Sequence, residues 1–230
     1  MEEIVLVGYG GHARSVADCI ERQNKYRIVG YTDVEQRNSR YQYLGTDTVL
    51  KDWYEQGIKN AAVGIGYMGK GTLRERLYES LRAIGYELPV IADPSAVISD
   101  HVQIGEGTFI GKGAVVNAEA RIGKMAIINS MALVEHDCIV EDYAHVAVSG
   151  VLCGQVKVGK AAFIGANATI LQCMEIPSKV TIPAGEVVRR NYRMEVKKNC
   201  KILTNICRGG GNLNLTCRQL TYKYAGCVAV

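Results

Sequence analysis

The chain has 230 residues, of which 48% are hydrophobic and 7% aromatic, so it can bury the core of one large domain or two small ones. Its formal net charge is +4, but residues 189–230 hold 9 basic and 1 acidic residue, which leaves the rest slightly acidic. The leading MEEIVLVGYG has acids where an export signal has lysines, and no stretch approaches the roughly 20 apolar residues of a membrane helix. These features argue against a secreted or membrane-spanning protein, and we expect a cytoplasmic one whose eight cysteines are reduced thiols.

Residues 1–90 alternate between strand-like and helix-like segments. The predicted order is strand Ile4–Val7, helix Ala13–Arg22, strand Arg27–Thr32, strand Ala61–Ile65 and helix Thr72–Ile84. In the last helix an apolar face with three- and four-residue spacing is formed by Leu73, Leu77, Leu81 and Ile84. The alternation predicts an α/β half-Rossmann domain of βαβαβ type, which we place at residues 1–92.

A six-residue repeat replaces this pattern after Pro94. Branched aliphatic residues occupy all sixteen positions reached in steps of six from Ile98 to Val188. A small residue follows most of them four positions later, as at Thr108, Ala114, Ala120, Ala126, Ala132, Cys138, Ala144, Gly150, Ala162 and Ala168. A helix would spread every sixth residue around its circumference, whereas three hexads make one triangular coil of about 18 residues. We therefore predict a left-handed parallel β-helix over residues 93–190.

Residues 191–230 lose this period and form a basic, cysteine-containing extension that we expect to be loosely packed or partly disordered. Such a tail can bind nucleic acid or anionic lipid, neutralise the phosphates of a small ligand, or stay solvated. Its cysteines, Cys200, Cys207, Cys217 and Cys227, are spaced too widely for an ordinary zinc knuckle. We expect no nucleic-acid partner.

The segment VGYGGHA contains a glycine motif between the first strand and the first helix. Gly8, Gly10 and Ala13 fit G-x-G-x-x-A, and Asp33 ends the next strand where a ribose-binding acid is expected. A dinucleotide site needs two such halves, so the single half favours a mononucleotide. His12 follows the glycines and could reach a diphosphate. The alternatives are a glycine turn needed only for packing and a His12 that is an ordinary surface residue.

The segment VEHDCIVEDYAH holds two of the four histidines, His136 and His145. Because the solenoid interior is aliphatic, both should face outward. The coil period places Ala118 below His136 and Gly154 above it, which leaves an open notch around the imidazole. Glu135 and Asp137 flank the ring and could hold one tautomer, so we interpret His136 as a catalytic base.

The chemistry that suits these residues is attack of an amine on a thioester. The imidazole would remove the amine's proton, and backbone N–H groups near Gly154 are candidates to stabilise the oxyanion. No cysteine or serine has a histidine beside it in a nucleophile motif, which favours direct transfer over an acyl-enzyme.

A zinc site like that of β-helical carbonic anhydrases is an alternative, with His101, His136 and His145 as ligands. His136 and His145, however, lie nine residues apart, about half a coil, so their rings should lie on different parts of the triangle. We expect no metal.

Three features resemble the bacterial sugar acyltransferases related to PglD and NeuD: VGYGGHARSVAD, the hexapeptide solenoid, and NSMALVEHDCIVEDYAHVAVSGVLCGQVKVG. The resemblance covers about residues 1–188. It implies that the half-Rossmann domain binds a nucleotide sugar and that a trimeric left-handed β-helix binds acetyl-CoA between neighbouring subunits. The family's Gly-Asn-Pro closing loop is missing here, and the basic tail stands in its place.

The resemblance also implies roles for individual residues. It makes His136 the general base and Glu135 or Asp137 its partner, and it places Asn129 beside the substrate. The implied acetyl-CoA groove comprises His145, Gly154, Ala166 and Ala184. The implied nucleotide-sugar loops comprise Gly10, Gly11, His12, Asp33, Gly64 and Ile65.

The function that we predict is transfer of an acetyl group from acetyl-CoA to the 4-amino group of a UDP- or dTDP-linked deoxy-amino sugar. Its setting would be surface glycan or glycoprotein biosynthesis, and its sites would lie between the subunits of a homotrimer. One alternative is an O-acetyltransferase of sialic acid or another sugar. Another is a trimeric scaffold without catalytic activity, in which the basic tail is the binding element.

Overall fold

The computed structural model describes residues 1–190 of the chain. The extension expected at residues 191–230 lies outside the described residues. No helix in the described part of the chain is long and apolar enough to cross a membrane.

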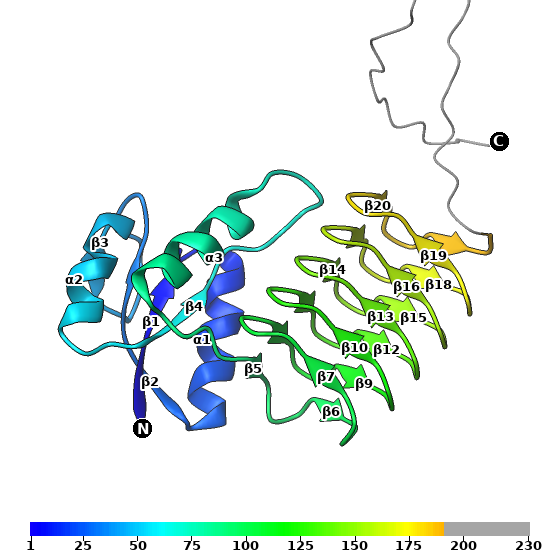
Figure 1. Ribbon diagram of the computed structural model, residues 1–230, viewed down its shortest axis with the longest axis horizontal. Helices are drawn as coiled ribbons and strands as arrows, with labels where there is room; N and C mark the ends of the chain where they lie inside the picture. Colours follow the sequence, from blue (N-terminus) through cyan, green and yellow to red (C-terminus); the bar gives the residue numbers. More distant parts are fainter. Residues whose placement is uncertain (191–230) are drawn as a thin grey trace, which may run out of the picture. The chain divides into compact units, whose positions relative to one another are not determined.

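The N-terminal part is a four-stranded parallel sheet with helices packed on it (Figure 1). Its elements are β1 (Glu2–Val7), α1 (Gly11–Gln23), β2 (Tyr26–Thr32), β3 (Tyr43–Gly45), a 3-10 turn (Asp47–Val49), α2 (Leu50–Glu55), β4 (Asn60–Val63) and α3 (Leu73–Ile84). The sheet order is β3-β2-β1-β4. The predicted α/β half-Rossmann fold is confirmed, and β3 and α2 are additions that the sequence did not indicate, because both are short.

The ends of the two long helices follow local chemistry. Helix α1 begins after Gly10 and ends at Asn24, which adopts a left-handed conformation with φ 54°. Helix α3 ends at Gly85, also left-handed, with φ 114°. The predicted apolar face of α3 is wrong at its first position, because Leu73 is 43% exposed and Arg74 takes its place beside Leu77 and Leu81.

The rest of the described chain is a parallel β-solenoid built from three sheets of two-residue strands (Figure 1). The first sheet contains β5 (Ile91–Ala92), β8 (Phe109–Ile110), β11 (Ile127–Ile128), β14 (His145–Val146), β17 (Phe163–Ile164) and β20 (Thr181–Ile182). The second contains β6 (Val97–Ile98), β9 (Val115–Val116), β12 (Leu133–Val134), β15 (Val151–Leu152), β18 (Thr169–Ile170) and β21 (Val187–Val188). The third contains β7 (Gln103–Ile104), β10 (Arg121–Ile122), β13 (Ile139–Val140), β16 (Lys157–Val158) and β19 (Glu175–Ile176).

The six-residue period follows from the geometry of each corner. The second residue of a strand, such as Val134 or Val140, points into the buried axis, and the first points outward. From Ile104 to Ile182, the backbone turns through a left-handed conformation three positions after each inward residue, as at Asp137 (φ 58°) and Tyr143 (φ 59°). The solenoid begins one hexad before Ile98, because β5 already pairs with β8.

The N-terminal part packs on the outer side of the first sheet. Tyr67 donates a hydrogen bond to the Ala161 carbonyl at 2.7 Å, and Tyr78 donates one to Glu106 at 2.5 Å. Two lysines of the solenoid, Lys112 and Lys160, form ion pairs with Asp18 and Glu75. The first sheet is thereby covered, and the second and third sheets carry no other part of the described chain.

Candidate functional site

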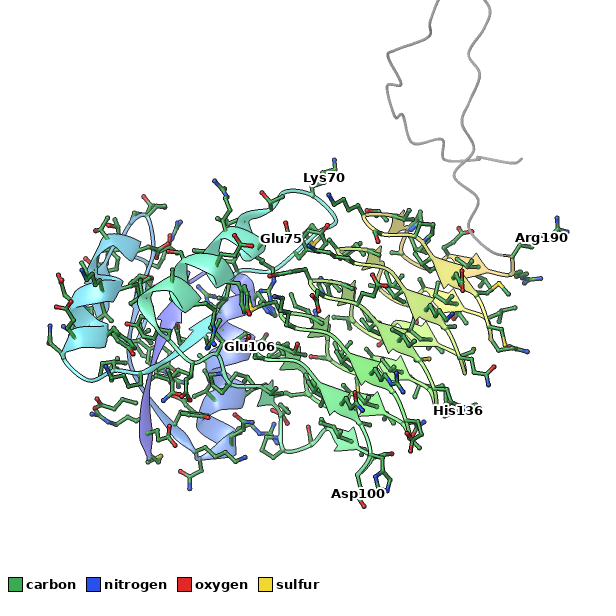
Figure 2. All side chains as sticks on the ribbon, in the orientation of Figure 1. Lys70, Glu75, Asp100, Glu106, His136 and Arg190 are labelled. Atoms are coloured by element: carbon green, nitrogen blue, oxygen red, sulfur yellow. The ribbon has the colours of Figure 1, made fainter. Side chains whose placement is uncertain are left out.

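His136 lies at the corner between the second and third sheets, in the turn from β12 to β13 (Figure 2). Its Nδ1 donates a hydrogen bond to Asp137 Oδ2 at 2.8 Å, and its backbone N–H donates one to Glu135 Oε2 at 3.2 Å. Asp137 is the left-handed residue of the turn, with φ 58°. The bond fixes the tautomer with Nδ1 protonated and leaves Nε2 with a free lone pair.

Gly154 lies against the other nitrogen of the same ring. A side-chain carbon at position 154 would come within 2.7 Å of His136 Nε2, closer than any real contact. The backbone holds this arrangement, because Gln155 N–H donates to the His136 carbonyl at 3.0 Å. The glycine at position 154, in the coil above His136, therefore leaves Nε2 accessible.

The charge around His136 favours its protonated form. The hydrogen bond to Asp137, with the nearby negative charges of Asp137 and Glu135, holds the pKa of the imidazole above its usual value. The side chain is exposed. An imidazole in this state is a stronger base than a free one, and Asp137 stabilises the imidazolium that forms when it accepts a proton.

His145 lies elsewhere, on the outer side of the first sheet, where the N-terminal part covers it. It is 5% exposed, its Nδ1 donates to the Tyr67 carbonyl at 2.6 Å, and Asn129 Nδ2 donates to its Nε2 at 3.2 Å. Burial lowers the pKa of His145 to about 4, and the positive charge of Arg74 adds to this effect, so the ring is neutral at pH 7. The structure thus joins His145 to Asn129, and places both away from His136.

His12 is also at this junction, next to the ring of Phe109. Burial, followed by the charges of Arg74 and His145, lowers its pKa to about 3. Its Nε2 is buried and has no hydrogen-bond partner among residues 1–190. His12 is therefore not an ordinary surface residue. Arg74 was not identified from the sequence as a residue of this junction. The available signal was its spacing of three and seven residues from Leu77 and Leu81.

The glycine loop lies at the edge of the N-terminal sheet. Gly64 packs so closely on Gly8 and Ala13 that a side chain would clash, whereas Gly10 and Gly11 face open space. Packing therefore explains Gly64 but does not explain Gly10 and Gly11.

Asp33 anchors this loop by accepting the Tyr9 backbone N–H at 2.9 Å. Burial acts to raise the pKa of Asp33, but the hydrogen bonds from Tyr9, Arg37 and Val34 outweigh it, so the pKa is lower than usual. Beside the loop is a pocket of about 450 Å³, lined in part by Tyr9, Arg14, Asn38, Arg40 and Tyr41.

The remaining predicted residues occupy a third place. Ala166 and Ala184 are exposed and stack in successive coils at the corner between the first and second sheets, where Gly185 N–H donates to the Ala166 carbonyl. Asn129 begins the same corner two coils earlier. The predicted acetyl-CoA residues are thus divided among three places. Ala166 and Ala184 lie at this corner, Gly154 lies at the corner of His136, and His145 lies on the covered side of the first sheet.

Two further features of the described residues bear on the chemistry. No group of three or more His, Cys, Asp and Glu side chains among residues 1–190 could hold a metal ion. A groove of about 540 Å³ crosses the third sheet, and its lining includes Gln103, Arg121, Glu141, Asp142 and Lys160.

Comparison with known proteins finds sugar N-acetyltransferases and a PglD domain family among the relatives of this chain. Residues 3–81 match the PglD N-terminal domain family. The GDP-perosamine N-acetyltransferase of Escherichia coli O157:H7 is 28% identical over 175 residues, which cover 73% of this chain and 77% of that protein.

Solved structures extend the similarity through the solenoid. A histidine-to-alanine variant of the Caulobacter crescentus GDP-perosamine N-acetyltransferase, in complex with CoA and GDP-perosamine, is 32% identical with a TM-score of 0.79. The match covers 83% of this chain and 90% of that one. The acetyltransferase domain of PglB from Neisseria gonorrhoeae FA1090 is 27% identical with a TM-score of 0.78, over 84% of this chain and 94% of that one. The chain therefore belongs to the PglD-like sugar acetyltransferases, and its solenoid is a left-handed parallel β-helix.

Proposed function

We propose that the protein transfers the acetyl group of acetyl-CoA to the 4-amino group of a nucleotide-linked deoxy sugar. The observation that carries this proposal is the corner of His136, where Asp137 fixes one ring nitrogen and Gly154 keeps the other open. Family relatives that bind CoA and GDP-perosamine support both substrates. The product, a 4-acetamido sugar, suits surface glycan or glycoprotein biosynthesis in the cytoplasm.

The reaction follows from the state of His136. The sugar amine attacks the thioester carbonyl, a C–N bond forms, and Nε2 of His136 takes the proton that the amine loses. The tetrahedral oxyanion then collapses, the C–S bond breaks, and the imidazolium returns the proton to the departing CoA thiolate. Asp137 keeps the ring oriented and stabilises its positive charge during both steps.

The N-terminal part suits the nucleotide. Gly10 and Gly11 present open backbone at the start of α1, and α1 has no acidic residue in its first turn and no side-chain cap. Such a helix start attracts phosphate. The adjoining pocket is lined by Arg14, by Arg40, which pairs with Glu21, and by Asp18. Asp33 orients the loop through Tyr9, besides any contact with the ribose.

The test is a thiol-release assay with acetyl-CoA and a panel of 4-amino sugars. UDP- and dTDP-linked sugars test the expectation from the sequence, GDP-perosamine tests the activity named for the relatives, and sialic acid tests O-acetylation. We expect CoA release with at least one nucleotide-linked amino sugar and none with sialic acid. Release of no thiol with any of the amino sugars would contradict the proposal.

We also propose a homotrimer in which neighbouring subunits complete the site. The outward side chains of the second sheet form an apolar column of Val97, Val115, Leu133, Val151 and Val187, interrupted by Thr169. Val97 is 62% exposed and Val187 is 42% exposed. The third sheet presents instead Gln103, Arg121, Lys157 and Glu175 around Ile139. An apolar column beside the corner of His136 supports a subunit interface at that corner.

Substituting Leu133→Asp should dissociate the trimer, because it buries a charge in the apolar column. Ile139→Asp, at the matching outward position of the third sheet, is the control and should leave the mass unchanged. Sedimentation or light scattering measures the mass of each variant. A wild-type protein that is monomeric at micromolar concentration would contradict this part of the proposal.

A further inference from the structure

Arg74 is a buried cation that the proposed mechanism does not use. Its side chain comes from the start of α3 and is 4% exposed. Nη1 donates a hydrogen bond to the Ile65 carbonyl, and Nη2 donates one to the Met125 carbonyl at 2.9 Å. The guanidinium forms no ion pair with a carboxylate within residues 1–190, and its buried Nε has no partner.

The two carbonyls belong to different parts of the molecule. Ile65 lies in the loop after β4, next to Gly64, whereas Met125 is the left-handed corner residue between β10 and β11 of the solenoid. The same loop is held a second time two residues later, where the Tyr67 carbonyl accepts from His145 Nδ1 at 2.6 Å. Its side chain is tied as well, because the Tyr67 hydroxyl donates to the Ala161 carbonyl. Two buried basic side chains therefore hold one loop onto the solenoid.

The need to hold the N-terminal part against the solenoid does not by itself explain a charged side chain at position 74. Burying a guanidinium is unfavourable, and an apolar side chain of similar volume would hold two packed surfaces at least as well. An arginine adds direction, because its planar fork sets the distance and angle between two acceptors. The acceptors here are the loop and a rigid corner of the solenoid.

We propose that Arg74 is a positioning residue that fixes the loop Gly64–Tyr67 over the solenoid, and thereby sets where the sugar nucleotide is presented for acetylation. The link to the nucleotide is that Gly64 and Ile65 of this loop are among the residues expected to bind it. The identity of the substrate in this statement rests on the function proposed above. The position of the loop does not, because it follows from the contacts of Arg74 and His145.

Electrostatics around the loop agree with this role. The titratable and charged groups that face one another at the junction are Arg74, His12, His145 and Tyr143. The positive charge of Arg74 lowers the pKa of both histidines further than burial alone. A neutral His145 can donate from Nδ1 to Tyr67 and accept at Nε2 from Asn129, whereas a protonated ring could not accept.

The test compares Arg74→Gln and Arg74→Lys with Arg76→Gln, an exposed arginine on the same helix. Loss of the double hydrogen bond should raise the KM for the nucleotide sugar about tenfold or more in both Arg74 variants. The kcat should fall less than about threefold, because the corner of His136 is untouched. Amide hydrogen exchange in Gly64–Tyr67 should speed up about tenfold or more in the Arg74 variants. Arg76→Gln should leave all three quantities unchanged.

The two readouts separate this proposal from the proposed function. Unchanged exchange in Gly64–Tyr67 in a folded Arg74→Gln protein would overturn the role of Arg74, whatever the substrate is. Faster exchange with an unchanged KM would also overturn it. If Arg74→Gln does not fold, Arg74→Lys decides the question, since lysine keeps the charge but lacks the planar donor fork that sets the angle between the two carbonyls. Failure of the wild type to release thiol from acetyl-CoA would count against the function alone.

Discussion

The corner of His136 and the junction around His145 give two histidines of one solenoid opposite properties. Nine residues separate them, and both project outward from two-residue strands or their turns. His136 is exposed, and a carboxylate raises its pKa, whereas His145 is buried, and its surroundings lower its pKa to about 4. The difference teaches that the solenoid sets only the direction of a side chain. What covers that side chain sets its chemistry.

Removing the imidazole ring of His136 should give the largest effect on catalysis. We expect His136→Ala to lower kcat about 10²–10⁴-fold, because it removes the only proton acceptor we assign to the reaction. Steady-state thiol release from acetyl-CoA measures this change. His101→Ala is the matched control, since His101 is an exposed histidine of the same corner column, and it should keep wild-type turnover. Full turnover of His136→Ala would refute the assignment.

The junction can be probed through the pH dependence of stability. The pKa of His145 is about 4 in the folded state and near 6.5 in the unfolded state, so only the unfolded state is protonated between these values. Its contribution is complete above about pH 6.5 and is lost as pH falls, by about 3 kcal/mol near pH 4. Urea unfolding at a series of pH values should show a shallower decline for His145→Gln than for wild type.

His136→Gln serves as the contrast in that experiment. The pKa of His136 is raised, so its stabilising contribution is present at low pH and is lost as pH rises. The His136 variant should therefore not become less sensitive to acid. Equal slopes for wild type and His145→Gln would show that the buried ring is not neutral.

The contact between Gly154 and His136 predicts a smaller effect on catalysis. Gly154→Ala places a carbon 2.7 Å from Nε2, so the exposed ring must swing away from Asp137. We expect kcat/KM to fall about tenfold while the melting temperature stays within a few degrees of wild type. A variant with wild-type kcat/KM would show that the ring does not react from the observed position.

Removing the carboxylate beside His136 should give the smallest change, a displacement of the pH profile. A base must be unprotonated to act, so activity falls as pH drops through the pKa of His136. Asp137→Asn removes the main cause of the raised pKa, and the acid limb of kcat/KM should move to lower pH. Glu135→Gln is the comparison and should move the limb less, because Glu135 bonds the backbone N–H and not the ring. An acid limb that stays in place in Asp137→Asn would contradict the assignment of this limb to His136.

The sequence by itself determined the solenoid. Each hexad pairs its backbone and packs its aliphatic residue with the hexads one coil away, and this requirement repeats every six residues along the chain. The same period placed Gly154 over His136, and the glycine motif of VGYGGHA marked the half-Rossmann domain. The tertiary structure alone decided that His145 is buried, that Nε2 of His12 is buried and that Arg74 joins the two parts. These properties come from contacts such as His145 with Tyr67, 78 residues apart in the chain. Local periodicity cannot encode them, because they depend on which outward face of the solenoid the N-terminal part covers.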